Sequence, residues 1–182
     1  MKKIILSILF ILSLSVNTYA QRIVYTNHTK NSSRILETNL KKVTRFGDKS
    51  RRFYMWAGLT SLDFKGVAIY SLKVMFTSEY RLTIDQEAPL VLTMNNGEDI
   101  ILKSAVKAES KYIDGVETVF GTYEIKESEL QAIAKNGVTK ISPTITCFGK
   151  SDYQENINMW KLARPLSLRY ELLKEYIKNN PE

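Results

Sequence analysis

The sequence predicts an α+β protein that is mainly β: an antiparallel sandwich or curved sheet with a short connecting helix and a C-terminal helix. Three observations support this fold class. β-Branched and aromatic residues alternate along the middle of the chain, most clearly over residues 66–78. Asn-Gly and Asp-Gly pairs separate such segments, as is typical of β-hairpins. The apolar period changes from two to about 3.6 residues only at 127–136 and at 166–179.

The first twenty residues have the pattern of a secretory signal peptide. Lys2 and Lys3 precede an apolar run over residues 4–16, and small residues stand at positions −3 and −1 of a cleavage site after Ala20. The run is shorter than the roughly 20 residues that span a bilayer, so a membrane anchor is the weaker interpretation. We expect cleavage after Ala20 and a periplasmic or secreted bacterial protein.

Two segments are predicted after the signal. Residues 21–39 are polar and irregular beyond a short strand candidate, which predicts a flexible lead-in. Residues 40–182 are expected to form a single β-rich domain of ordinary size.

The domain begins with a basic and aromatic stretch, LKKVTRFGDKSRRFYMWAG, that predicts a hairpin turning at residues 47–49. In its second strand Arg52, Tyr54 and Trp56 share one face at period two. Such a hairpin can simply be a charged sheet edge, because Arg and Lys stems cover apolar surface while their heads stay in water. It can also be a cationic tip over an aromatic platform. The candidate binding residues are Arg45, Lys49, Arg51, Arg52, Tyr54 and Trp56.

The strands that follow are predicted from alternation and turn chemistry. Segment 66–78 is apolar on much of both faces, which predicts a central strand or one between two layers. Segment 88–104 reads as a hairpin with a type I′ turn at Asn96-Gly97, and segment 111–125 as another around Asp114-Gly115.

Two helices complete the predicted fold. Residues 127–136 carry acids at the start, Lys135 near the end and Gly137 as a stop. In the C-terminal helix, 166–179, Pro165 suits the first helical position. Its apolar stripe predicts packing on its own domain, with docking on a partner as the alternative.

The sequence lacks the residues that most catalytic mechanisms need. His28 is the only histidine and Cys147 the only cysteine, so neither a nucleophile–histidine–acid arrangement nor a histidine- and cysteine-rich zinc site is predicted. We expect Cys147 to be buried, and no cofactor or metal is predicted. One enzyme class stays open, a carbohydrate-active hydrolase with a carboxylate pair. Its candidate acids are Asp63, Asp85, Glu87, Asp114, Glu117 and Glu124.

The formal net charge of +7 favours anionic partners. In an exported protein these would be another envelope protein, an anionic lipid headgroup or an acidic polysaccharide, and not nucleic acid. A non-enzymatic binding or structural role in the bacterial cell envelope is therefore the leading hypothesis.

Three stretches also resemble a group of small exported bacterial β-rich proteins that have no assigned function. They are KKVTRFGDKSRRFYMW, LVLTMNNGEDIIL and YEIKESELQAIAKNGVTKI. Because these motifs are structural, the resemblance implies a fold and not an activity. The helix entry at Lys126 lacks the Ser or Thr that usually caps such a start.

Overall fold

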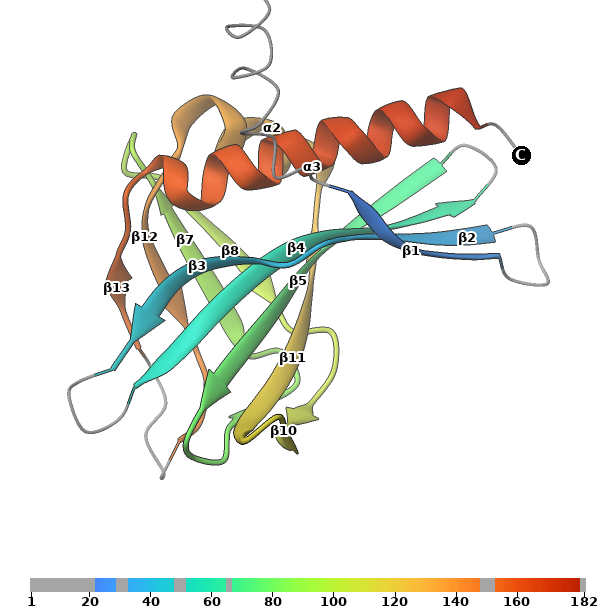
Figure 1. Cartoon of the computed structure of the whole chain (residues 1–182). Coiled ribbons are helices and arrows are strands. Elements are labelled where there is room, and N and C mark those ends of the chain that lie inside the picture. Colours follow the sequence, from blue (N-terminus) through green and yellow to red (C-terminus); the bar gives the residue numbers. More distant parts are fainter. Residues whose placement is uncertain (1–21, 29–32, 48–51, 65–66, 148–152, 181–182) are drawn as a thin grey trace, which may run out of the picture.

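The structure is a computed structural model, and it describes residues 22–28, 33–47, 52–64, 67–147 and 153–180. The described part of the chain is mainly β, with two helices and a curled antiparallel sheet, which confirms the predicted fold class (Figure 1).

The largest sheet has the order β1-β2-β4-β5-β11-β10, with β3 also paired to β4. Its strands are β1 (Ile23–His28), β2 (Ser33–Thr38), β3 (Lys41–Phe46), β4 (Phe53–Phe64), β5 (Val67–Ser78), β10 (Lys111–Ile113) and β11 (Val116–Ile125). We call its buried side, which carries Phe53, Met55 and Leu72, the inner face, and the opposite side, which carries Tyr54 and Trp56, the outer face.

The long strand β4 pairs on one edge with two short strands in succession. β2 pairs with residues 60–64 and β3 with residues 53–57, so the chain breaks its pairing around Asn39. The buried Arg169 side chain stabilises this break, since its Nε and Nη2 both donate to the Asn39 carbonyl at 3.0 and 2.8 Å. Thr38 Oγ1 accepts a hydrogen bond from the Leu59 amide at 2.8 Å.

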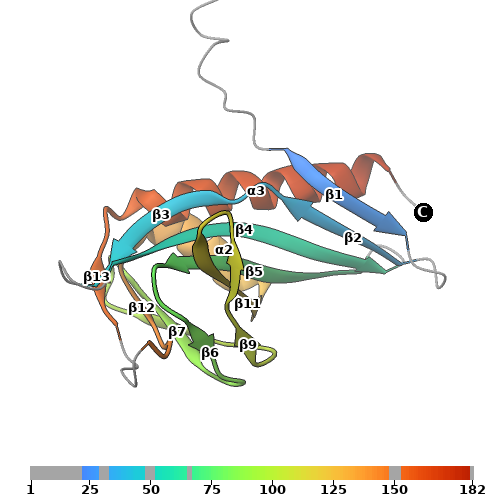
Figure 2. The same cartoon turned by 60° about the horizontal axis from the view of Figure 1, so that its bottom comes forward.

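The remaining strands form two smaller sheets that close the other side of the core. One has the order β13-β12-β7-β8 and the other pairs β6 with β9 (Figure 2). Their bounds are β6 (Thr83–Ile84), β7 (Pro89–Met94), β8 (Asp99–Lys103), β9 (Ala108–Glu109), β12 (Val138–Pro143) and β13 (Glu155–Asn156). Isolated bridges between Ser104 and Tyr123 and between Thr83 and Thr146 tie the sheets together.

Both predicted hairpin turns occur, but the turn types differ. Asp114 and Gly115 have φ of 49° and 86°, and both central residues of a type I′ turn have positive φ. At the other hairpin only Gly97 has positive φ, and its amide donates to the Met94 carbonyl at 3.0 Å. That loop is a turn followed by a left-handed glycine, so the prediction of a type I′ turn at Asn96-Gly97 was wrong.

Helix α2 (Glu127–Asn136) has the predicted bounds. Glu129 Oε2 accepts a hydrogen bond from the Lys126 amide at 2.7 Å, which satisfies one backbone donor at this helix start without a Ser or Thr. Gly137 follows with φ of 75° and donates to the Ile133 carbonyl.

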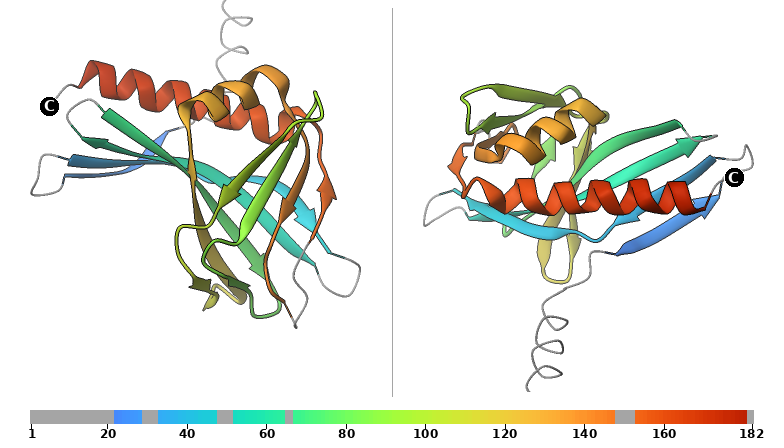
Figure 3. Two further views of the ribbon diagram at one scale, coloured as in Figure 1. Left: turned by 180° about the vertical axis from the view of Figure 1, so that it is seen from behind. Right: turned by 90° about the horizontal axis from the view of Figure 1, so that it is seen from above.

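Helix α3 (Trp160–Asn179) lies across one end of the sheets beside α2 and packs on β3, β4 and β12 (Figure 3). It begins six residues earlier than predicted, so Pro165 lies inside the helix and not at its first position. Burial of Leu162, Ala163 and Leu166 holds this first part against the core. The predicted apolar stripe packs on its own domain, with Tyr170 and Leu173 buried.

The structure corrects the prediction of a flexible lead-in over residues 21–39. Within that range β1 and β2 are strands of the large sheet. β2 alternates in burial, but two of its three buried residues, Arg34 and Thr38, are polar. One face of this strand is buried, but its sequence does not show the alternation of apolar and polar residues that usually predicts such a strand.

Strand β5 is central, between β4 and β11, as predicted. Its inner residues Tyr70, Leu72, Val74 and Phe76 are buried. No described element covers the outer face near its start, where Val67 is 67% exposed and Ile69 51%.

Candidate functional site

The basic and aromatic stretch forms the hairpin of β3 and β4, and a β-bulge decides which side chains meet. Lys42 lies opposite Trp56 and Arg45 opposite Tyr54, although Lys42 and Arg45 are three residues apart. The register shifts by one residue between Lys42 and Thr44, so Val43 and Thr44 are both buried. Because of this bulge, Lys42 and Arg45 lie on the outer face together with the two aromatic rings.

Lys42, Tyr54 and Trp56 form one contact group. The Lys42 Nζ lies 4.0 Å from the centroid of the Tyr54 ring and 5.6 Å from that of Trp56. The two rings meet edge to face, with centroids 6.1 Å apart. A cation over an aromatic face is attracted by the ring quadrupole, so the rings hold the ammonium at a defined place on the sheet.

Two further cations stand beside this group. Arg45 is exposed opposite Tyr54, and Arg52 is exposed two positions before Tyr54. Neither they nor Lys42 forms an ion pair with another residue that the structure describes. We call Lys42, Arg45, Arg52, Tyr54 and Trp56 the cation–aromatic cluster.

Four of the six predicted binding residues are thus placed: Arg45, Arg52, Tyr54 and Trp56. The other two, Lys49 and Arg51, lie outside the described residues. Sequence reasoning missed Lys42 as a member, because strict alternation from Arg45 assigns it to the opposite face. A bulge leaves no composition signal that would have shown this.

The outer face continues from the cluster across the next two strands. Met75 lies opposite Trp56, and Phe120 opposite Met75. Lys73 lies with its Nζ 5.8 Å from the Phe120 centroid, and it is held by Glu37 at 2.7 Å. This lysine is therefore neutralised locally, whereas no described residue forms an ion pair with any of the three cluster cations.

The acids considered for a hydrolase have structural partners or stand exposed. Asp63 is bound by Arg34, Glu87 by Lys103, and Glu117 accepts a hydrogen bond from Ser110. Asp85, Asp114 and Glu124 are exposed. These contacts lie in different parts of the fold and favour no particular pair as catalytic groups.

Other reactive side chains are placed as follows. Cys147 is buried, as predicted. The described residues contain no group of three or more His, Cys, Asp or Glu side chains able to hold a metal ion. No helix in the described part of the chain has the length and apolar character needed to cross a membrane.

A second polar cluster joins α2, α3 and β5. The Tyr170 hydroxyl donates to Glu127, and Lys174 donates to Tyr170 at 3.3 Å. The Tyr70 ring meets Tyr170 edge to face, and burial together with the neighbouring Tyr170 and Glu127 raises the pKa of Tyr70 to about 12. These contacts join the two helices to the sheet, which is a structural role.

Comparisons of the chain with protein family models, with curated proteins and with solved structures find no match.

Proposed function

We propose that this chain is a non-enzymatic binding protein of the bacterial cell envelope, and that its cation–aromatic cluster binds an acidic polysaccharide. The observation that carries the proposal is the bulge at Val43. It places Lys42 on the same sheet face as Arg45, Arg52 and the two aromatic rings, and none of the three cations has an ion-pair partner among the described residues. The signal-like residues 1–20 support export.

The geometry favours a linear polyanion over a lipid surface. Lys42 covers the face of Tyr54, so that ring is not free to enter a bilayer interface. Neighbouring strands lie about 4.8 Å apart, and successive residues on one face about 7 Å, so the cations form a row along the hairpin. Repeated anionic groups along a polymer can contact several of them together, whereas each exposed contact alone is weak.

The test is affinity for dextran sulfate, with neutral dextran as the uncharged polymer. We expect residues 21–182 to bind dextran sulfate and not dextran, with affinity falling as salt rises. The triple variant Lys42→Gln, Arg45→Gln, Arg52→Gln should weaken binding at least tenfold.

A charge-matched control separates the cluster from net charge. Lys111 is exposed on β10, and Lys161 and Lys178 are exposed on α3, so none of the three belongs to the hairpin. Replacing all three by glutamine changes the net charge equally, and we expect it to leave most of the binding. Equal losses in both triple variants would refute the proposal, and so would binding only to phosphatidylglycerol vesicles.

A further inference from the structure

At one end of the large sheet, charged side chains lie on the buried inner face and apolar side chains on the exposed outer face, the reverse of the usual arrangement. This end, which we call the wing, consists of β1, β2 and the ends of β4 and β5 at residues 60–64 and 67–71, and it extends to one side under the C-terminal half of α3 (Figure 1). Its inner face buries charge: Arg34 and Asp63 are 4% and 1% exposed. Its outer face presents aliphatic and aromatic side chains.

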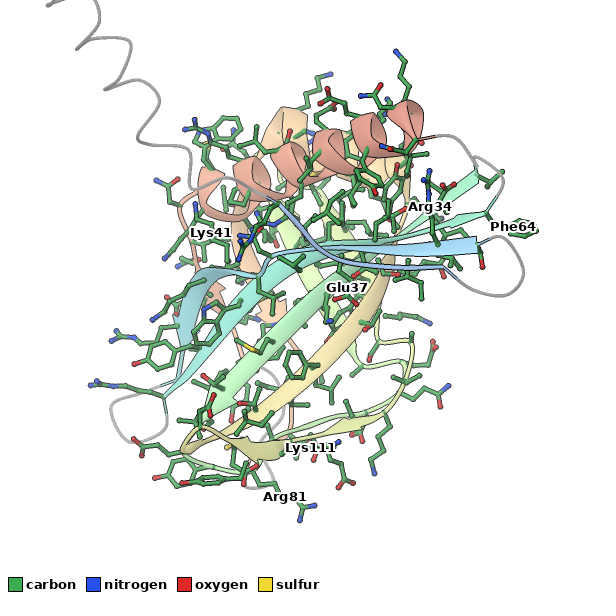
Figure 4. The ribbon with its side chains drawn as sticks, turned by 45° about the vertical axis from the view of Figure 1, so that its right-hand side comes forward. Arg34, Glu37, Lys41, Phe64, Arg81 and Lys111 are labelled. Atoms are coloured by element: carbon green, nitrogen blue, oxygen red, sulfur yellow. The ribbon has the colours of Figure 1, made fainter. Side chains whose placement is uncertain are left out.

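The outer face of the wing carries an apolar plate. Leu62, Phe64, Val67 and Ile69 are 39%, 45%, 67% and 51% exposed, and the half-buried Ile35 adjoins them. Leu62 pairs with Ile69 and Phe64 with Val67 across the β4–β5 hairpin, so the side chains form two adjoining rows. In Figure 4, Phe64 points outward at the end of the hairpin, whereas Arg34 lies toward α3.

Both parts of this arrangement carry an energetic cost in a monomer. Burying an ion pair costs desolvation energy, and exposing large apolar side chains forgoes burial energy. Exchanging the polarity of the two faces would avoid both costs in a monomer. The pattern is consistent with an outer face that is covered in the working protein.

The charges next to the plate favour a second copy of the chain over an anionic bilayer. The adjoining row across the sheet contains Glu37, Thr60, Ser71 and Glu124. Glu37 is ion-paired with Lys73, and Glu124 is exposed. An anionic bilayer would be repelled by Glu124, and no free cation is described beside the plate to attract it. The plate itself is uncharged, so it fits an identical plate without any charge bias.

Its size also fits a symmetric contact. A standard interface buries about 800 Å² on each partner, with an apolar centre and a polar rim. The exposed parts of the plate supply a few hundred Å² of apolar centre per copy, and the adjoining polar row supplies part of the rim.

We propose that two copies of this chain associate through their apolar plates about a two-fold axis. In such an isologous contact each plate covers the other, so the exposed apolar side chains of both wings become buried. The dimer also carries two cation–aromatic clusters, so a polyanion long enough to reach both would bind more tightly than to either alone.

Sedimentation velocity of residues 21–182 over a range of concentrations tests the dimer. We expect twice the monomer mass, with a dissociation constant on the order of micromolar for a contact of this size. The variant Phe64→Ser, Val67→Ser should be a folded monomer, with its far-ultraviolet circular dichroism unchanged.

The matched control is Ile101→Ser, Val106→Ser, which removes two apolar side chains that are 60% and 57% exposed outside the wing. This variant should remain a dimer. A wild-type chain that stays monomeric at every concentration would overturn the proposal, as would a dimer that survives the plate substitutions. Monomers that bind phosphatidylglycerol vesicles through the plate would also overturn it. Loss of dextran sulfate binding bears only on the cluster, so the two proposals fail separately.

Discussion

The ammonium of Lys42 lies 4.0 Å from the centre of the Tyr54 ring, although the two residues belong to different strands and meet only because of the bulge at Val43. This contact holds the lysine of the cation–aromatic cluster in place. The interaction free energy of the two side chains should be measurable without any ligand.

A double-mutant cycle with Lys42→Met and Tyr54→Leu should give a coupling free energy of about 0.5–1 kcal/mol, as for other exposed cation–π pairs. Urea unfolding of the four proteins measures it. Lys41, the neighbouring exposed lysine labelled in Figure 4, lies opposite Ala57, so the cycle of Lys41→Met with Tyr54→Leu should show no coupling. Equal coupling in both cycles would show that Lys42 is not held by the ring.

The buried pair of Arg34 and Asp63 should respond strongly when only one partner is removed. Arg34 Nε donates to Asp63 Oδ2 at 2.7 Å, and Arg34 Nη2 donates to the Ile177 carbonyl of α3. Asp63→Asn leaves a buried guanidinium without its counter-charge, so we expect the free energy of unfolding to fall by about 3–5 kcal/mol.

Two comparisons sharpen that measurement. The double variant Arg34→Met, Asp63→Leu removes both charges and should recover much of the loss. Glu109→Gln breaks the exposed pair with Arg81, which should cost under about 1 kcal/mol. If Asp63→Asn and Glu109→Gln cost the same, the buried pair does not hold α3 to the wing.

Gly58 should tolerate no added methyl group. A Cβ there would lie 3.0 Å from Leu40 Cδ2 and 3.2 Å from the carbonyl oxygens of Thr38 and Asn39. Two of these neighbours are backbone atoms at the break between β2 and β3, so they cannot move aside independently. We expect Gly58→Ala to lower the free energy of unfolding by about 1–3 kcal/mol in chemical denaturation.

The sign of this effect makes the test decisive. Gly→Ala at an unstrained, uncrowded position usually stabilises a protein by about 0.4–1 kcal/mol, through the unfolded state. A stabilised Gly58→Ala would therefore show that the approach of β2 and β3 is looser than described. Thr60→Ala, on the same face of β4, serves as the control and should change little.

Stability should decline in alkali, beginning near pH 10. The folded chain holds the pKa of Tyr70 at about 12, against an ordinary 10.0, through burial and the nearby Tyr170 and Glu127. Between these values the unfolded chain releases a proton that the folded chain keeps, so the stabilising contribution is full below pH 10 and is lost as pH rises toward 12. Burial also raises the pKa of Tyr123 and adds to the effect.

Urea unfolding at intervals from neutral pH to about pH 11 measures the decline. Tyr70→Phe removes one of the responsible groups, so its stability should fall less steeply above pH 10 than that of the wild type. An identical slope in the two proteins would assign the decline to other groups.

Local chemistry predicted some parts of this fold well. The bounds of α2 followed from its charges, its apolar period and Gly137, and the two hairpins followed from their Asn-Gly and Asp-Gly pairs. Such signals depend on interactions within a few residues, so they can be recognised in the sequence without knowledge of the rest of the molecule.

The parts that could not be predicted depend on contacts distant in sequence. β2 was not predicted because one of its buried residues is a charged one, Arg34, whose partner Asp63 lies 29 residues away in the sequence. Lys42 was assigned to the wrong face because a bulge is set by pairing with β4, not by composition. Helix α3 passes Pro165 because Leu162 and Ala163 are buried ahead of it. The candidate site was therefore predicted in its aromatic and arginine members but not in its central lysine.

Because β2 and β3 pair in succession along β4, we expect the domain to contain two cooperative units that share β4 and β5, its two longest strands. The unit at the β3 end is closed by stacked aromatic rings, among them Phe46 and Phe53, whose centroids lie 5.5 Å apart. The wing is closed by the ion pair of Arg34 and Asp63 and by the end of α3, so we expect its separation to expose less apolar surface. Local opening should therefore start at the wing and stop at Asn39, leaving the other unit intact.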